Sequence, residues 1–369
     1  MRAMSRTLLA PAAVYASVMI GGGYGTGREV VQYFSSLGLV GGLAALATAL
    51  CCFALVMFLT FELARVHRAY DYRVFFKELI GPAWWLFEAL YLILMLLVIG
   101  VIGSASAEIL YTRFTIPESL GTVLMLFIML LTVGLGRRIL ELLMGMWLTI
   151  MYCLFGAYFF FVINAVPALE ANRWEYSGSA SQALSSGALY AFYNVSVVPV
   201  LLYAVRDLST RIEAGVSAVF TALVVAAPAL LFHLSFMVAP EEVLSEPVPM
   251  YWMMATYAPP LFLQLFVIVL LGTLAQTGAG LLQGFIERVE GAMAAVTVNN
   301  QTVGSKTAGL SGPRRLVLVL LILAVSAGLS SFGIIALIGQ GYALLAVGFG
   351  FVYVLPLLLR SLSITKLLR

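Results

Sequence analysis

A glycine-rich stretch interrupts the first apolar segment of the chain. Residues 20–29 read Ile-Gly-Gly-Gly-Tyr-Gly-Thr-Gly-Arg-Glu. Each glycine destabilises a helix by about 1 kcal/mol relative to alanine, and a charged side chain costs roughly 2.5–3.5 kcal/mol at the centre of a membrane helix. Unwound backbone at membrane depth is tolerated only where it is buried in protein or lines a cavity. We therefore expect this stretch to mark an internal site.

The composition indicates the class of protein. Of the 369 residues, 62% are hydrophobic and only 10% are charged, whereas soluble domains carry about 25% charged residues. We therefore predict an all-α membrane protein that crosses the lipid bilayer several times. The sequence shows no nucleotide-binding loop, no metal-binding spacing of its three cysteines and no nucleophile–base motif, so we expect neither an enzyme nor a nucleic acid partner.

Apolar runs long enough to cross a bilayer, at about 20 residues each, predict ten transmembrane helices. They cover residues 7–34, 37–64, 83–113, 117–136, 142–166, 185–205, 208–238, 259–290, 314–336 and 339–360. With the N-terminus inside, all Lys and Arg residues except Arg28, Arg113 and Arg173 fall in cytoplasmic segments. This distribution predicts a protein of the cell (inner) membrane with both termini in the cytoplasm.

The helices divide into two halves with matching interruptions. Tyr193, Asn194, Ser196 and Pro199 place polar groups and a proline inside the sixth helix, and proline removes a backbone hydrogen bond. Interrupted helices one and six each open a five-helix half. Such a pair indicates a transporter built from an inverted repeat, with its site at the membrane midplane.

The expected organisation is therefore a first repeat at 1–166, an external loop at 167–184, a second repeat at 185–360 and a cytoplasmic tail at 361–369. A second external loop, at 239–258, is rich in proline and acidic residues. We expect that loop to form a folded cap over the outer mouth.

The glycine stretch, together with Tyr193-Asn194, resembles the YkvI-like membrane proteins. That family is similar to the amino acid–polyamine–organocation superfamily, which has the LeuT fold, and the resemblance covers nearly the whole chain. The family form of the stretch is close to Gly-Ala-Gly-Phe-Ala-Ser-Gly-Gln-Glu. This chain departs from it at Gly22, Tyr24, Gly25, Thr26 and Arg28.

The solute site is expected at the two interruptions. Free N–H groups at the start of the outer half-helix would bind an anionic group such as a carboxylate. Close helix packing is the alternative interpretation of the glycines. The residues predicted to bind solute are Gly21, Gly22, Gly23, Tyr24, Gly25, Ser104, Tyr193 and Asn194.

Three charged residues are candidates for gating or coupling. Arg28 would serve as an outer gate or pair with an acid. Glu29 would cap the half-helix through Thr26-x-x-Glu29, carry a coupling proton or bind a solute amine. Glu108 lies one turn beyond Ser104 in the third helix, and an acid inside a membrane helix is a functional candidate by default.

By the same resemblance, a sodium ion is a candidate ligand, and no other cofactor is expected. In sodium-coupled members of the LeuT fold, hydroxyls of helix eight join carbonyls of the broken helix one around the ion. The matching positions here are Thr273 and Thr277 with the carbonyls of Ile20 and Gly23. The alternative is that both threonines bond their own helix backbone.

The sequence thus predicts a secondary active transporter that moves a small polar solute, an amino acid or an amine, by alternating access. Transport would be coupled to sodium or to protons. The rival hypothesis is a non-transporting receptor or scaffold that keeps the same fold. The oligomeric state stays open.

Overall fold

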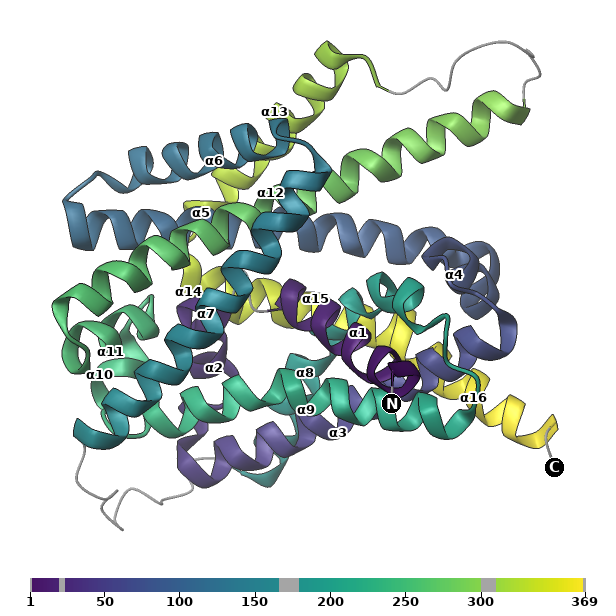
Figure 1. The fold of residues 1–369 in the computed structure, drawn as a ribbon, viewed down its shortest axis with the longest axis horizontal. Coiled ribbons are helices and arrows are strands. Elements are labelled where there is room, and N and C mark those ends of the chain that lie inside the picture. The colour runs from purple at the N-terminus through teal and green to yellow at the C-terminus, as the bar shows by residue number, and fades with distance from the viewer. Residues whose placement is uncertain (1, 20–23, 166–178, 300–309, 368–369) are drawn as a thin grey trace.

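The chain is helical throughout the part that the computed structural model describes, which is residues 2–19, 24–165, 179–299 and 310–367 (Figure 1). The long helices are α1 (Arg2–Met19), α3 (Gly38–His67), α5 (Trp85–Phe114), α6 (Glu118–Gly134), α7 (Arg137–Ala165), α8 (Ala180–Asn194), α9 (Arg211–Phe236), α12 (Pro260–Asn299) and α13 (Gly312–Ser330). Shorter elements are α2 (Arg28–Tyr33), η2 (Ser35–Leu37), α4 (Tyr72–Ile80), η3 (Gly81–Trp84), η5 (Val195–Val205), α10 (Pro240–Ser245) and α11 (Pro249–Tyr257). The last apolar run forms α14 (Ile334–Ala336), η6 (Leu337–Tyr342), α15 (Ala343–Phe349), η7 (Gly350–Val354) and α16 (Leu355–Leu367).

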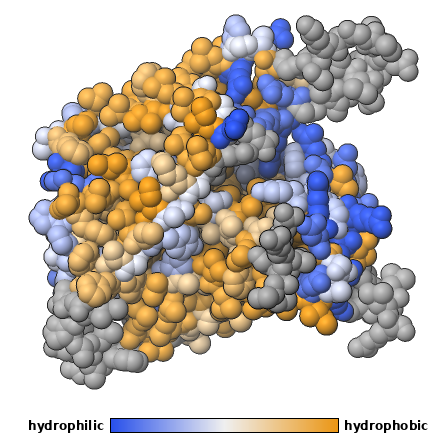
Figure 2. Space-filling view, in the orientation of Figure 1, coloured by the Kyte–Doolittle hydropathy of each residue, from blue (hydrophilic) through white to orange (hydrophobic). Residues whose placement is uncertain are grey.

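Eight helical stretches of the described residues are long and apolar enough to cross a membrane. Two shorter apolar helices, Leu8–Met19 and Glu118–Gly134, fall in the first and fourth predicted runs. Figure 2 shows hydrophobic residues over most of one face, with hydrophilic residues gathered at the side where Figure 1 places both termini. These features describe an integral membrane protein, and the number of ten spans stays a prediction.

Both predicted interruptions coincide with changes in the backbone. In the first run, Gly27 has a φ of 77° and caps a new helix, α2, at Arg28. In the sixth run, α8 passes at Val195 into a 3-10 helix of 11 residues that contains Pro199. A 3-10 run of this length is uncommon and marks a hinge or a strained segment. The sixth run therefore changes helix type where a break was expected.

The external segments differ in part from expectation. A capping box between Ser179 and Gln182 starts α8 at Ala180, inside the range 167–184 that was expected to be a loop. The predicted cap at 239–258 does fold, as the short helices α10 and α11. Figure 1 shows both on the side opposite the chain termini.

The long helices pack into two groups. The broken-helix group consists of α1, α3, α8 with η5, and α9, which pack on one another. The continuous-helix group consists of α5, α6, α12 and α13, which also pack on one another. Within the first group, the buried imidazole of His233 on α9 lies 3.0 Å from the Ser35 hydroxyl and 3.0 Å from the Leu39 carbonyl. This histidine thus ties α9 to the start of α3 as a hydrogen-bonded core residue.

We predict that Gly27→Ala destabilises the protein more than the matched change Gly136→Ala. Both glycines have a positive φ, but an added Cβ at Gly27 would lie 2.7 Å from Phe236 and 2.9 Å from Met250, whereas at Gly136 it meets nothing within 4 Å. The left-handed backbone penalises both variants by roughly 1–2 kcal/mol, and overpacking adds about 1–3 kcal/mol at Gly27 alone. Thermal unfolding in detergent measures the difference, and equal losses of stability would contradict the close packing at Gly27.

Candidate functional site

The turn at Gly27 places two adjacent charged residues on different sides of the short helix α2. Neighbouring side chains on a helix point about 100° apart. The Arg28 guanidinium donates from Nη1 to the carbonyls of Leu244, at 2.9 Å, and Glu246, at 3.0 Å. These carbonyls lie in the last turn of α10 and directly after it, so Arg28 holds the cap onto the broken helix.

The Glu29 side chain connects the two broken helices. It is only 4% exposed, and its carboxylate accepts a short hydrogen bond from the Tyr193 hydroxyl of α8. The bond joins the first interrupted run to the second, 164 residues away along the chain. The N-terminal cap of α2 is Gly27, without a side-chain cap bond.

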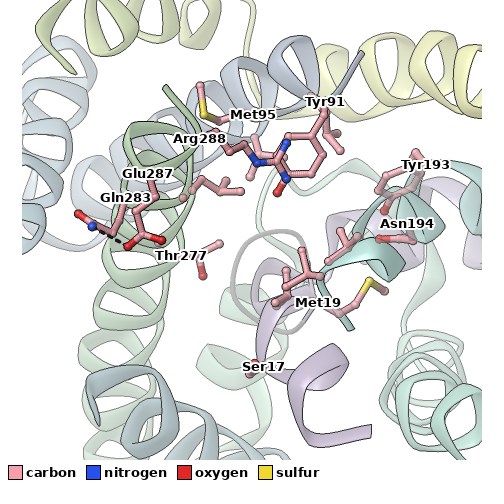
Figure 3. Close-up of a pocket in the computed structure, with 18 of the residues that line it drawn as sticks. Ser17, Met19, Tyr91, Met95, Tyr193, Asn194, Thr277, Gln283, Glu287 and Arg288 are labelled. Atoms are coloured by element: carbon pink, nitrogen blue, oxygen red, sulfur yellow. Dashed lines mark hydrogen bonds between the residues drawn. The ribbon is translucent and has the colours of Figure 1, made fainter. Parts of the chain in front are cut away.

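A cavity of about 350 Å³ lies between the two helix groups (Figure 3). From the broken-helix group it is lined by Ser17, Met19, Tyr193 and Asn194, and from α2 by Glu29. From the continuous-helix group it is lined by Tyr91, Met95, Thr277, Gln283, Glu287 and Arg288. Its last residues on α12 lie toward the side of the chain termini. We call it the inner cavity, after the predicted topology.

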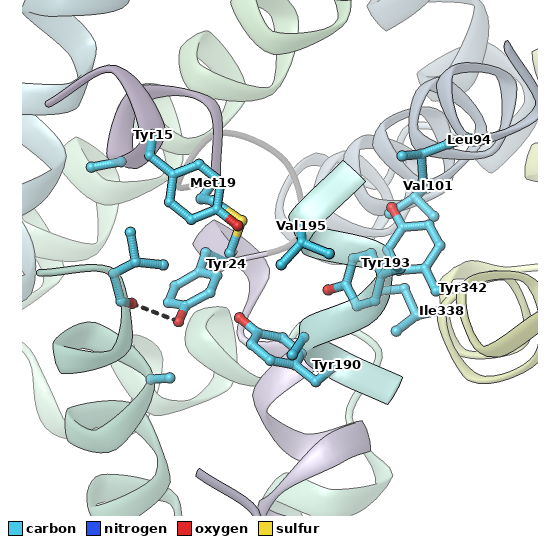
Figure 4. Packing of buried hydrophobic residues seen from close by; sticks show 14 of the residues in the cluster. Tyr15, Met19, Tyr24, Leu94, Val101, Tyr190, Tyr193, Val195, Ile338 and Tyr342 are labelled. Atoms are coloured by element: carbon cyan, nitrogen blue, oxygen red, sulfur yellow. Dashed lines mark hydrogen bonds between the residues drawn. The ribbon is translucent and has the colours of Figure 1, made fainter. Parts of the chain in front are cut away.

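Two tyrosines that line the inner cavity, Tyr193 and Tyr342, pack with a third, Tyr33. The ring of Tyr193 lies 4.8 Å from that of Tyr342 and 5.8 Å from that of Tyr33, measured between centroids. The Tyr33 hydroxyl donates to the carbonyl of Ile338 at 3.4 Å. Figure 4 shows Tyr193, Tyr342 and Ile338 packed together. We call Tyr33, Tyr193 and Tyr342 the tyrosine layer.

A second cavity of about 590 Å³ lies next to the cap, on the elements α2 and η6 that also carry Tyr33 and Tyr342. It is lined by Gln32, Ser104, Glu108, Glu118, Pro247 and residues 332–336, 339 and 340. We call it the outer vestibule, after the predicted topology. Its charged lining residues, Glu108 and Glu118, are both acidic, and an acidic cleft raises the local concentration of cations.

Arg288, at the mouth of the inner cavity, is paired with an acidic residue. The Arg288 guanidinium donates to Glu88 at 3.1 Å. It also lies over two aromatic rings, 4.4 Å from the centroid of Tyr72 and 4.1 Å from that of Tyr91. Cation–π contacts of this kind stabilise a guanidinium, so Arg288 forms part of the wall at the mouth.

The two predicted sodium ligands on α12 bond their own helix. The Thr273 hydroxyl donates to the Val269 carbonyl, and the Thr277 hydroxyl donates to the Thr273 carbonyl at 2.8 Å. Thr277 nevertheless lines the inner cavity with Glu29. The hydroxyl oxygens keep lone pairs that a cation would use, so the sodium site stays a prediction.

The predicted solute residues do not all meet in one place. Tyr193 and Asn194 line the inner cavity, whereas Ser104 lines the outer vestibule with Glu108. Gly25 is buried, and the Tyr24 hydroxyl donates to the Val225 carbonyl of α9 at 2.9 Å (Figure 4). The remaining predicted positions, Ile20, Gly21, Gly22 and Gly23, lie outside the described residues.

Sequence reasoning did not find the tyrosine layer or the mouth. Tyr33 and Tyr342 are aromatic residues inside apolar runs, and such residues are usually core. Tyr33 does fall four residues after Glu29, hence on the same side of α2. This spacing could have predicted that Tyr33 lies near Glu29.

The comparisons with known proteins concern the fold. The sequence matches no protein-family model and no curated protein. The chain resembles the structure of a glutamate-to-alanine variant of the Eremococcus coleocola manganese transporter, with 14% identity and a TM-score of 0.50 over 96% of this chain and 78% of that one. A structure of the same transporter with an aromatic bis-isothiourea substituted compound is 15% identical, with a TM-score of 0.45 over the same shares. The first likeness shows that the chain has the fold of a membrane transporter.

We predict that Arg28→Gln releases the cap. Hydrogen bonds from a charged group contribute roughly 1.5–3 kcal/mol each, and 1.4 kcal/mol corresponds to a tenfold change in an opening equilibrium. Amide hydrogen exchange in α10 and α11 should therefore accelerate by about tenfold or more. Arg113→Gln, at the exposed end of α5, is the matched control. Unchanged exchange in the Arg28 variant would show that the cap is held by other contacts.

Proposed function

We propose that this chain is a secondary active transporter that moves a small polar solute by alternating access. The observation that carries the proposal is a pair of cavities that share α2 and η6 but are lined by different residues of each. Glu29 and Gln32, three residues apart on α2, line different cavities, as do Tyr342 and Gln340 on η6. A solute at Glu29 would thus be open toward one side of the protein and closed from the other.

We also propose that the chain is a five-plus-five inverted repeat of the LeuT type, as the resemblance to YkvI-like proteins implies. Support comes from the packing. The first and second runs group with the sixth and seventh, and the third and fourth group with the eighth and ninth. Equivalent positions of two repeats would combine in this way around a pseudo-two-fold axis.

The polar groups of the inner cavity favour a small organic solute. Glu29 offers a carboxylate, Asn194 an amide, and Ser17 and Thr277 hydroxyls, while Met19 and Met95 supply apolar wall. Pockets with mostly apolar walls and a few placed polar groups hold small molecules. An amine or an amino acid fits this set. Manganese, the ion in the name of the structural neighbour, is a comparison solute in the binding experiment described below.

We predict that single cysteines in the two cavities react from opposite sides of the membrane. In a background that lacks Cys51, Cys52 and Cys153, a cysteine at Val197 reports on the inner cavity and one at Ser104 on the outer vestibule. A membrane-impermeant maleimide should label Val197→Cys from the cytoplasmic side and Ser104→Cys from the outside.

A mixture of amino acids and amines should then change the two labelling rates in opposite directions, because alternating access opens one cavity as it closes the other. Labelling of both cysteines from one side, or rates that change together, would contradict the proposal. Such a result would favour a receptor or scaffold.

We predict, for the sodium hypothesis, that sodium raises the melting temperature and potassium does not. A ligand at one hundred times its dissociation constant stabilises by about 2.7 kcal/mol. Thr277→Val keeps the side-chain shape but removes the hydroxyl, so the sodium-specific stabilisation should largely vanish. Identical curves in the two salts for the wild-type protein would exclude sodium and leave protons as the coupling ion.

A further inference from the structure

Glu29 is a buried acid that accepts a hydrogen bond from the Tyr193 hydroxyl. The Tyr193 ring packs in turn against the rings of Tyr33, Tyr190 and Tyr342. One side of the carboxylate faces the inner cavity.

The basic residues nearest to this acid are engaged elsewhere. Arg28 is next to Glu29 in sequence, but its Nη1 donates to carbonyls of the cap. Arg288 is the one basic side chain among the described residues that line the inner cavity, and it pairs with Glu88 between Tyr72 and Tyr91. Glu287, the other acid of the cavity, accepts from Gln283 at 2.9 Å. In the described part of the chain, Glu29 therefore has no basic partner.

An ionised carboxylate that is buried without a cation is strongly disfavoured. Its charge must be removed by a proton or balanced by a bound cation. Tyr193 and Tyr342, which line the cavity with Glu29, favour the second occupant too, because the faces of tyrosine rings attract cations. The cavity of about 350 Å³ has room for a small organic cation beside the carboxylate.

We propose that Glu29 is a single site with two alternative occupants, a proton and a monovalent organic cation, so that the protein exchanges protons for organic amines across the membrane. The inference rests on the proposed transport function and names its solute class and its coupling. When the cation binds, the Glu29 O–H bond breaks and the proton leaves to the water on the side that the cavity faces. The site loses one positive charge and gains one, and the reverse exchange takes place on the other side.

The charges at the two entrances are consistent with a cationic solute. The outer vestibule, with Glu108 and Glu118, attracts cations and repels anions. At the inner mouth, Arg288 is neutralised by Glu88 and so does not repel a cation. The outer entrance thus favours a solute with net positive charge over a zwitterionic amino acid.

The test measures binding and proton release together on the purified full chain. Tetramethylammonium, ethylammonium and benzylammonium are the cationic probes; benzyl alcohol, benzoate, glycine and Mn²⁺ are the comparison solutes. Calorimetric titration in two buffers of different ionisation enthalpy counts the protons. We expect at least one cation to bind with release of about one proton, and its affinity to fall by about tenfold for each pH unit on the acidic limb.

Three variants link the proton to Glu29. Glu29→Gln should abolish proton release and weaken cation binding by about a hundredfold or more, whereas Glu29→Asp, which keeps a carboxylate, should retain proton release. Glu62→Gln removes a carboxylate that pairs with Arg65 on α3 outside both cavities, so both signals should remain. Retained proton release in Glu29→Gln would overturn the assignment, as would its loss in Glu62→Gln.

The remaining outcomes separate this inference from the proposed function. Cation binding that is constant between pH 5.5 and 8.5 overturns proton exchange at Glu29. Binding of glycine or Mn²⁺ in place of the cations, or of none of the probes, overturns the solute class. In each of these cases the reciprocal cysteine labelling still decides whether the protein is a transporter at all.

Discussion

The left-handed backbone at Gly27 is the constraint on which the site depends. Its φ of 77° interrupts the first apolar run and allows α2 to start at Arg28, and its missing Cβ leaves room for Phe236 and Met250. A continuous helix would have carried Arg28 and Glu29 through the membrane centre without partners. The turn instead gives each charge its own polar surroundings, because Arg28 reaches the cap and Glu29 reaches α8.

The two charges are stabilised in unequal ways, and the inequality has chemical consequences. Arg28 donates to backbone carbonyls, which cannot leave or titrate, so its role is to hold structure. Glu29 accepts from a hydroxyl and faces a cavity, so part of its surroundings is exchangeable. Arg28 thus has fixed partners, whereas Glu29 has partners that can exchange. Because both residues lie on the six-residue helix α2, this helix connects the cap to the proposed solute site.

The sequence predicts those parts of the site that depend on local backbone physics. Glycine and proline change the backbone conformation at their own positions in the chain. The interruptions near Gly27 and Pro199 could therefore be expected, as could the folded cap. Which side chains share a cavity depends on helix rotation and spacing, which tertiary packing decides. Ser104 and Tyr193, which we expected to share one site, line different cavities for this reason. Arg288 is neutralised because α4 and α5 pack near this part of α12. No local sequence pattern predicts such a contact between distant segments.

The close packing within the broken-helix group suggests where motion occurs. Gly187 of α8 lies so near Ala45 and Thr48 of α3 that a Cβ there would clash with backbone, and His233 fastens α9 to the same helix. Densely packed elements move as units. The contacts of the tyrosine layer are instead mainly between aromatic rings, with single hydrogen bonds such as that from Tyr33 to Ile338. Contacts of this kind break and re-form with little loss, so we expect α2 and η6 to change position while α3, α8 and α9 stay together. The Tyr193–Glu29 bond lies at the boundary between the rigid and the moving parts, so the occupant of Glu29 would bias which cavity is open.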